Sequence, residues 1–236
     1  MADNRAWTVL PHGELEALEP NLWRVEGRLA RAPMKRVMTV ARLASGALVV
    51  YSPIALGEPA MAQLDALGDV AFIVTPNGWH RIDTPAYAKR YPRARVLAPA
   101  GARKRVCEVA TVAGGLDALP ADPSVRLVPV AGTREAEAML IATSGDRTSI
   151  AVSDTIFNMP HRRGVGGFVL RHITQSSGGP RVSRLARNFI IKDKPQFAAQ
   201  LELLATPQLA RVIVAHHQVI ADDPAAVLRR IAAAMV

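Results

Sequence analysis

The order of apolar and polar positions along the chain predicts a series of short strands, with a helix after most of the later ones. Nine segments are apolar, or alternate between apolar and polar residues, over the length of a strand. They are 22–25, 36–42, 47–52, 71–75, 95–98, 125–130, 139–143, 148–153 and 212–215. Because residues 47–51 are apolar throughout, we expect that strand to be covered on both faces.

Helical signals lie between these segments. A proline stands in the first turn of four predicted helices, where its missing N–H costs nothing. These helices are 58–67, 84–91, 195–204 and 224–235, and a fifth, 182–191, follows a stretch rich in Gly and Arg. This order predicts a mixed α/β domain with two sheets and outer helices. We assign residues 20–236 to this single domain and residues 1–19 to an N-terminal extension.

The composition is typical of a folded protein without disulfide bonds. Of the 236 residues, 50% are hydrophobic, and the single Cys107 excludes a disulfide framework and a Cys-based zinc finger. No apolar run reaches the roughly 18 residues of a membrane helix, and residues 1–10 lack the apolar region of a signal peptide. We therefore expect a soluble, cytoplasmic protein with no membrane partner.

The net charge bears on the choice of partner. Lys and Arg number 29 and Asp and Glu 20, a formal net charge of +9 at pH 7, and such an excess attracts phosphates and anionic substrates. A solvated basic surface explains the same excess more simply. Because the chain has no nucleic-acid-binding module and its aromatic residues are scattered, we expect a small-molecule ligand, anionic if the charge serves binding, rather than a nucleic acid. The sequence leaves a homo-oligomer open.

Three of the predicted strands are each followed by an ionisable side chain. His80 comes after the strand 71–75, Asp154 directly after 148–153, and His216 directly after 212–215. Ligands of open α/β sheets bind beyond the carboxyl ends of strands. Two imidazoles and a carboxylate in that place predict either a divalent-metal site or an acid/base pair. Each residue also has a purely structural interpretation, such as a turn-capping Asp154, and the sequence does not separate the role of His216 from that of His217.

A wider set of residues carries a resemblance to a known family. These residues are Asn21-Leu22-Trp23, Arg36-Val37-Met38-Thr39-Val40, Tyr51-Ser52-Pro53, Thr75-Pro76-Asn77, His80, Tyr91-Pro92, Ser153-Asp154, Phe157-Asn158, Arg184, Arg187, Lys192-Asp193 and Val214-Ala215-His216. In them the chain resembles the metallo-β-lactamase superfamily, and more closely a divergent branch known as a domain of unknown function. The resemblance extends from Asn21 to the C-terminus. It implies a metallo-β-lactamase-like αββα sandwich, that is, two mixed β-sheets with outer helices and a site at one edge.

The motif that carries metal in active members of that superfamily is degenerate here. Active members have H-x-H-x-D-H after the strand that corresponds to 71–75. In this register Pro76 and Gly78 replace two metal-binding histidines, His80 stands where Asp is usual, and Arg81 stands where His is usual. The next expected histidine is also missing near Gly132. The resemblance therefore implies a reduced metal site.

One hypothesis is a metal-dependent hydrolase with a single ion. The resemblance matches Asp154 to the bridging Asp and His216 to the last His, so His80, Asp154 and His216 would hold one zinc, iron or manganese ion, which activates water. His80 and Asp154 are then catalytic residues. Glu137 is a candidate fourth ligand and catalytic assistant. The alternative interpretation is that Glu137 is only an exposed carboxylate at a strand edge.

The second hypothesis dispenses with the metal. Arg81 pairs with Asp154 and fills the vacated cationic position, so that the chain is a non-catalytic ligand-binding or interaction protein without a cofactor. In either case we expect Asn77 and Arg81 beside the ligand, and Trp79 either lines the pocket or fills the core. The basic loop at Arg162 and Arg163 either clamps an anionic substrate or is an ordinary surface loop.

Overall fold

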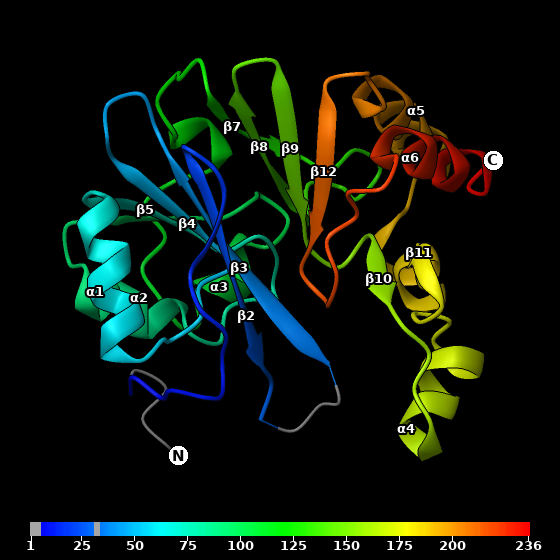
Figure 1. Ribbon diagram of the computed structural model, residues 1–236, viewed down its shortest axis with the longest axis horizontal. Helices are drawn as coiled ribbons and strands as arrows, with labels where there is room; N and C mark the ends of the chain where they lie inside the picture. Colours follow the sequence, from blue (N-terminus) through cyan, green and yellow to red (C-terminus); the bar gives the residue numbers. More distant parts are fainter. Residues whose placement is uncertain (1–5, 31–33) are drawn as a thin grey trace.

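Figure 1 presents the computed structural model, which describes residues 6–30 and 34–236. Two sheets form its centre, with strand orders β1-β2-β3-β4-β5-β6 and β12-β9-β8-β7. The first consists of β1 (Glu16–Glu19), β2 (Leu22–Arg28), β3 (Lys35–Arg42), β4 (Leu48–Tyr51), β5 (Val70–Val74) and β6 (Arg95–Leu97). The second consists of β7 (Val125–Pro129), β8 (Ala138–Ser144), β9 (Arg147–Val152) and β12 (Leu209–Val214). A separate antiparallel pair joins β10 (Phe157–Met159) to β11 (Gly179–Arg181).

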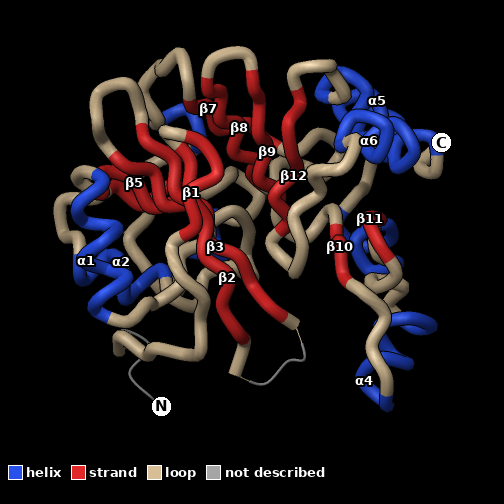
Figure 2. Tube along the Cα trace, viewed as in Figure 1, coloured by secondary structure: helices blue, strands red, loops and turns tan. Residues whose placement is uncertain are grey.

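Helices cover the outer face of each sheet (Figure 2). On the larger sheet these are α1 (Glu58–Leu67) and α2 (Thr84–Arg90), and on the smaller sheet α5 (Lys194–Leu204) and α6 (Pro224–Ala233). The shorter helices are α3 (Arg103–Val106), the 3₁₀ turn Leu116–Ala118, α4 (Gly164–Phe168) and the π turns Val169–Ile173 and Ala186–Ile190. Within the described ranges no helix has the length and apolar character needed to cross a bilayer. The layers confirm the predicted αββα sandwich of two mixed sheets with outer helices.

Strand β3 illustrates why the two sheets stack. Its alternate residues Val37 and Ala41 face the second sheet and lie in a core with Leu140 and Ile213. Met38 lies on the opposite face, in the core formed with α1 and α2. Both faces of the strand are therefore apolar, as expected for a sheet that is covered on both sides.

The N-terminal segment differs from the prediction. Residues 1–19 were expected to extend beyond the domain, but β1 is the edge strand of the larger sheet and pairs with β2. Trp7 also packs on Tyr87 and donates a hydrogen bond from Nε1 to the Leu56 carbonyl at 2.8 Å. Residues 1–5 of that predicted extension lie outside the described residues. The strand was missed because it is short and half exposed at an edge, so burial leaves little periodicity in its sequence.

The segment between β10 and α5 is irregular and was predicted poorly. The helix expected over 182–191 is helical only over 184–190. It begins after Ser183, whose Oγ accepts a hydrogen bond from the Ala186 N–H at 3.1 Å, as an N-terminal capping serine does. In Figure 1, β10 and β11 lie beside β12 of the second sheet and α4 lies away from it, and an isolated bridge between Asn158 and His217 connects β10 to the chain after β12.

Candidate metal centre

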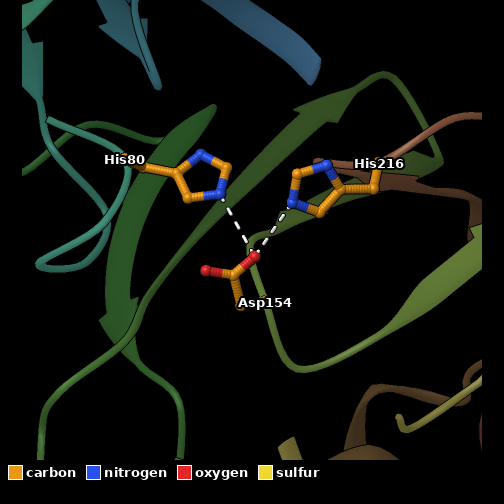
Figure 3. A group of neighbouring side chains, drawn as sticks. All are labelled: His80, Asp154 and His216. Carbon is orange, nitrogen blue, oxygen red and sulfur yellow. Dashed lines mark hydrogen bonds and ion pairs between the residues drawn. The ribbon is translucent and has the colours of Figure 1, made fainter. Parts of the chain in front are cut away.

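The carboxyl ends of β5, β9 and β12 bring His80, Asp154 and His216 together (Figure 3). The Oδ1 atom of Asp154 lies 3.2 Å from His80 Nε2 and 3.0 Å from His216 Nε2. One donor atom from each of the three residues lies within 4.8 Å of the others. These three residues are called the donor cluster below. It joins the same three strand ends that the sequence singled out, and it contains His216 rather than His217.

The remaining polar atom of each cluster residue is held by a neighbour. His216 Nδ1 lies 2.8 Å from the Lys35 carbonyl and therefore donates to it, since a carbonyl only accepts. His80 Nδ1 lies 2.9 Å from Ser52 Oγ, and Asn77 Nδ2 donates to Asp154 Oδ2 at 2.8 Å. Such contacts fix the orientation and tautomer of metal-binding side chains in proteins. They leave two Nε2 atoms and Oδ1 directed at one place.

The cluster needs a positive charge at its centre. A neutral His216 that donates from Nδ1 presents the lone pair of Nε2 to Asp154 Oδ1 at 3.0 Å, and two lone pairs at this distance repel. Burial raises the pKa of Asp154, but the charges and hydrogen bonds of His80 and His216 outweigh burial and hold that pKa well below its usual range. Burial lowers the pKa of His216, yet the hydrogen bond and charge of Asp154 hold it above its ordinary value. The centre thus takes either a proton or a metal cation.

The donor set fits a divalent metal. Imidazole nitrogen and carboxylate oxygen are the ligands used for zinc and for other first-row ions such as iron and manganese. The edge of a tetrahedral zinc site is roughly 3.3 Å long for Zn–N distances of about 2.0–2.1 Å, which is close to the Nε2–Oδ1 separations of 3.2 and 3.0 Å. Three protein ligands also leave a position for water, as in catalytic zinc sites.

Glu137 lies behind the cluster rather than in it. Its Oε1 accepts from Asn77 Nδ2 at 2.8 Å, and its Oε2 accepts from the Asp154 N–H at 3.3 Å. The side chain is fully buried, so the alternative of an exposed strand-edge carboxylate is wrong. Burial, and then the charge of Asp154, raise the pKa of Glu137 well above its usual value. These contacts support Asp154 and Asn77, and they do not place Glu137 among the three converging donor atoms.

Arg81 does not take the place of the metal. Its guanidinium donates to Glu108 Oε2 at 2.7 Å and to the carbonyl of Arg105. Among the described residues, the ion-pair partners of Asp154 are the two cluster histidines. The predicted pairing of Arg81 with Asp154 is therefore wrong, because Asp154 already has cationic partners and Glu108 offers Arg81 an exposed carboxylate.

The other predicted ligand-binding residues lie in different surroundings. A cavity of about 580 Å³ borders the donor cluster, and Trp79 lines it. Asn77 is buried and accepts hydrogen bonds at Oδ1 from the N–H groups of Trp79 and His80, so it shapes the loop that carries them. Arg162 and Arg163 are exposed residues just before α4, and they are not among the described residues that line the cavity.

Ser52 is a site residue to which the sequence assigned no role. It follows β4 with a left-handed φ of 56°, is buried, and lines the cavity beside His80. The order Ser52–His80–Asp154 resembles the triad of serine hydrolases. However, the residue after Ser52 is Pro53, which has no N–H to serve as an oxyanion donor. Ser52 therefore supports His80, and its position at a strand end, like those of the cluster residues, was the signal that could have revealed it.

Comparison with known proteins supports the fold and leaves the activity open. The model of a domain of unknown function, DUF4336, matches residues 29–102. A crystal structure of a metallo-β-lactamase from Erythrobacter litoralis, with β-mercaptoethanol in the active site, is similar with a TM-score of 0.62. The two share 11% sequence identity, over 93% of this chain and 96% of that one. No curated protein matches the sequence.

Proposed function

We propose that this chain, which has the metallo-β-lactamase fold, is a hydrolase that holds one divalent metal ion on His80, Asp154 and His216. The observation that carries the proposal is the convergence of three donor atoms whose outer partners leave them free to bind one cation. A divalent ion there would supply a Lewis acid and an activated water.

The surrounding residues prepare the donors for this task. The Lys35 carbonyl keeps the Nδ1 proton of His216 in place, so that ring presents Nε2 to the centre. The Ser52 hydroxyl, which can accept as well as donate, lies 2.9 Å from His80 Nδ1 and orients the second ring with its Nε2 toward the same place. Asn77 holds the second carboxylate oxygen of Asp154. Burial and the charge of Asp154 raise the pKa of Glu137, so the surroundings disfavour a second negative charge behind Asp154.

The number of donors favours one ion over two. Pro76 and Gly78 stand in the register of two metal-binding histidines. Within the described residues, His80, Asp154 and His216 form the one group with the spacing of a metal site. Three protein ligands suffice for one catalytic ion and fall short of a binuclear centre.

Metal analysis of the purified full chain tests the proposal. The protein is stripped with a chelator, reloaded separately with zinc, manganese or iron, and assayed on lactones, esters, thioesters and phosphodiesters. We expect one ion per chain with at least one metal, loss of that ion in His216→Ala, and activity only in the loaded protein. His172→Ala is the matched control, because His172 is an exposed imidazole outside the cluster.

Failure of every metal to bind stoichiometrically to folded protein would refute the proposal. The chain would then be a metal-free binding protein. Arg81 would not supply the positive charge of its site, because Arg81 is paired with Glu108.

A further inference from the structure

Apolar side chains make up most of the cavity wall beside the donor cluster. They come from segments far apart in the chain: the loop after β5, strand β10 and the two π turns with their flanks. The residues used in the argument are Trp79, Ile82, Phe157, Leu170, Leu185 and Phe189. Trp79 is 55% exposed and Phe189 is 67% exposed, although side chains of this type are usually buried. Exposed apolar surface gathered around a cavity is typical of a ligand-binding groove.

Most polar side chains in the wall are already bonded to other protein groups. Thr174 Oγ1 lies 2.8 Å from Ser176 Oγ, and Ser183 Oγ accepts from the Ala186 N–H. Ser52 contacts His80. Outside the donor cluster, the wall therefore offers a ligand apolar contacts more than open hydrogen-bonding groups.

The charges in the wall do not favour an anion. Arg36 lines the cavity, but its Nη2 lies 2.6 Å from Asp83 Oδ2, so a carboxylate already neutralises it. The exposed Arg162 and Arg163 do not belong to the described lining.

From these contacts we infer that the substrate is a neutral carboxylic ester with an aliphatic acyl chain, which lies along the apolar wall with its carbonyl at the donor cluster. The inference rests on the proposed hydrolase function and names its substrate class. The cavity volume of about 580 Å³ lies within the roughly 300–1,000 Å³ that is usual for small-molecule sites. In the reaction the oxygen of water bonds to the acyl carbon, the bond from that carbon to the alcohol oxygen breaks, and the alcohol oxygen takes a proton from the water.

Binding of unreactive ketones tests the cavity separately from the chemistry. Straight-chain alkan-2-ones from butanone to dodecanone are titrated by calorimetry into the full chain, both metal-loaded and chelator-treated. We expect the affinity to rise about fourfold for each added methylene until the cavity is full, from a gain of about 0.8 kcal/mol per buried methylene. No dependence on chain length would overturn the inference.

A pair of matched variants tests where the aliphatic chain of the ligand binds. Phe189→Ser removes a side chain that lines the cavity and is 67% exposed, and Phe168→Ser removes one that is 60% exposed on α4 outside the described lining. We expect Phe189→Ser to weaken binding of the longest ketone about tenfold and to flatten the series, and Phe168→Ser to leave both unchanged. Ile82→Ser repeats the test on the loop after β5, which also lines the cavity. Equal effects of the Phe189 and Phe168 substitutions would overturn the inference.

Ester hydrolysis separates this inference from the proposed function. With loaded protein, kcat/KM for 4-nitrophenyl esters should rise from acetate to octanoate, and a succinate half-ester should be a poorer substrate than the neutral butanoate. Preference for the anionic ester, or hydrolysis without dependence on chain length, would overturn the inference while leaving the metal hydrolase standing. Chain-length-dependent ketone binding by a protein that binds no metal would overturn the metal hydrolase, and with it the ester as a substrate, and would leave an apolar binding site.

Discussion

The donor cluster and the segment 155–191 border the same cavity and are built in opposite ways. The three cluster side chains are at most 15% exposed, and their polar atoms have partners on both sides. Asp154 and His216 stand just beyond β9 and β12, and His80 stands on the loop after β5. The segment 155–191 consists of a short strand pair, α4 and two π turns, and it leaves several large apolar side chains exposed, including Phe168, Ile173 and Phe189.

This difference separates the demands of chemistry from those of recognition. Donor atoms must be held within fractions of an ångström, which strand ends and bonded loops achieve. Binding of an aliphatic ligand chain requires only apolar contact area, and irregular helical turns supply that area without exact hydrogen-bond geometry. Changes in the cluster should therefore alter metal binding or stability, and changes in the segment should alter the choice of substrate.

The strongest test of the cluster is Asp154→Ala. It removes the oxygen shared by both imidazoles, and we expect the metal affinity to fall by more than roughly 100-fold, beyond the usual loss for an outer-shell partner. Calorimetry with the metal that binds the wild type provides the measurement, and ketone binding to the same variant is the control. If the variant keeps the metal affinity of the wild type, Asp154 is not a ligand of the metal.

Glu137→Ala tests the buried support behind the cluster. It leaves the Asp154 N–H without its acceptor, at a cost of about 1–3 kcal/mol for a buried group left unsatisfied, whereas Asn77 Nδ2 keeps Asp154 Oδ2 as an acceptor. Urea unfolding should show the loss. If the free energy of unfolding is unchanged while hydrolysis disappears, Glu137 acts directly in catalysis as the sequence suggested.

Ser52→Gly separates the support of His80 from the strain at Ser52. Glycine adopts the φ of 56° more easily than serine, so the fold should be no less stable, whereas the contact with His80 Nδ1 is lost. We expect about 10–100-fold weaker metal binding, measured by competition with a chelating dye. If the metal affinity is unchanged, Ser52 serves only the turn after β4. If hydrolysis is lost while the metal still binds fully, Ser52 acts as a nucleophile.

The smallest effect is expected for Arg81→Met. Its partner Glu108 is 55% exposed at the side chain, and exposed ion pairs contribute about 0–1 kcal/mol. Metal affinity should stay within about twofold of the wild type, because Asp154 has other partners. A large loss would show that the Arg81 loop holds His80 in place.

The cluster could be predicted because each of its residues follows a buried strand in the sequence. The positions of Asp154 and His216 follow from the carboxyl ends of two strands that pair in parallel, β9 and β12. His80 required one further step, since a loop of several residues separates it from β5 and Asn77 shapes that loop. Arg81 was predicted wrongly because its spacing from His80 says nothing about Glu108, which reaches it from the chain after α3.

By itself, the sequence determined the strands of the two main sheets apart from β1, and with them the two-layer core and the strand ends where chemistry could gather. It did so because burial on both faces of a sheet leaves a local record in alternating and continuous apolar residues. The tertiary structure alone decided which polar atoms meet: Ser52 with His80, the Lys35 carbonyl with His216, and Arg81 with Glu108. It also decided that the cavity wall is apolar although the chain carries a charge of +9, because net charge counts residues and a cavity presents only those that the fold turns inward.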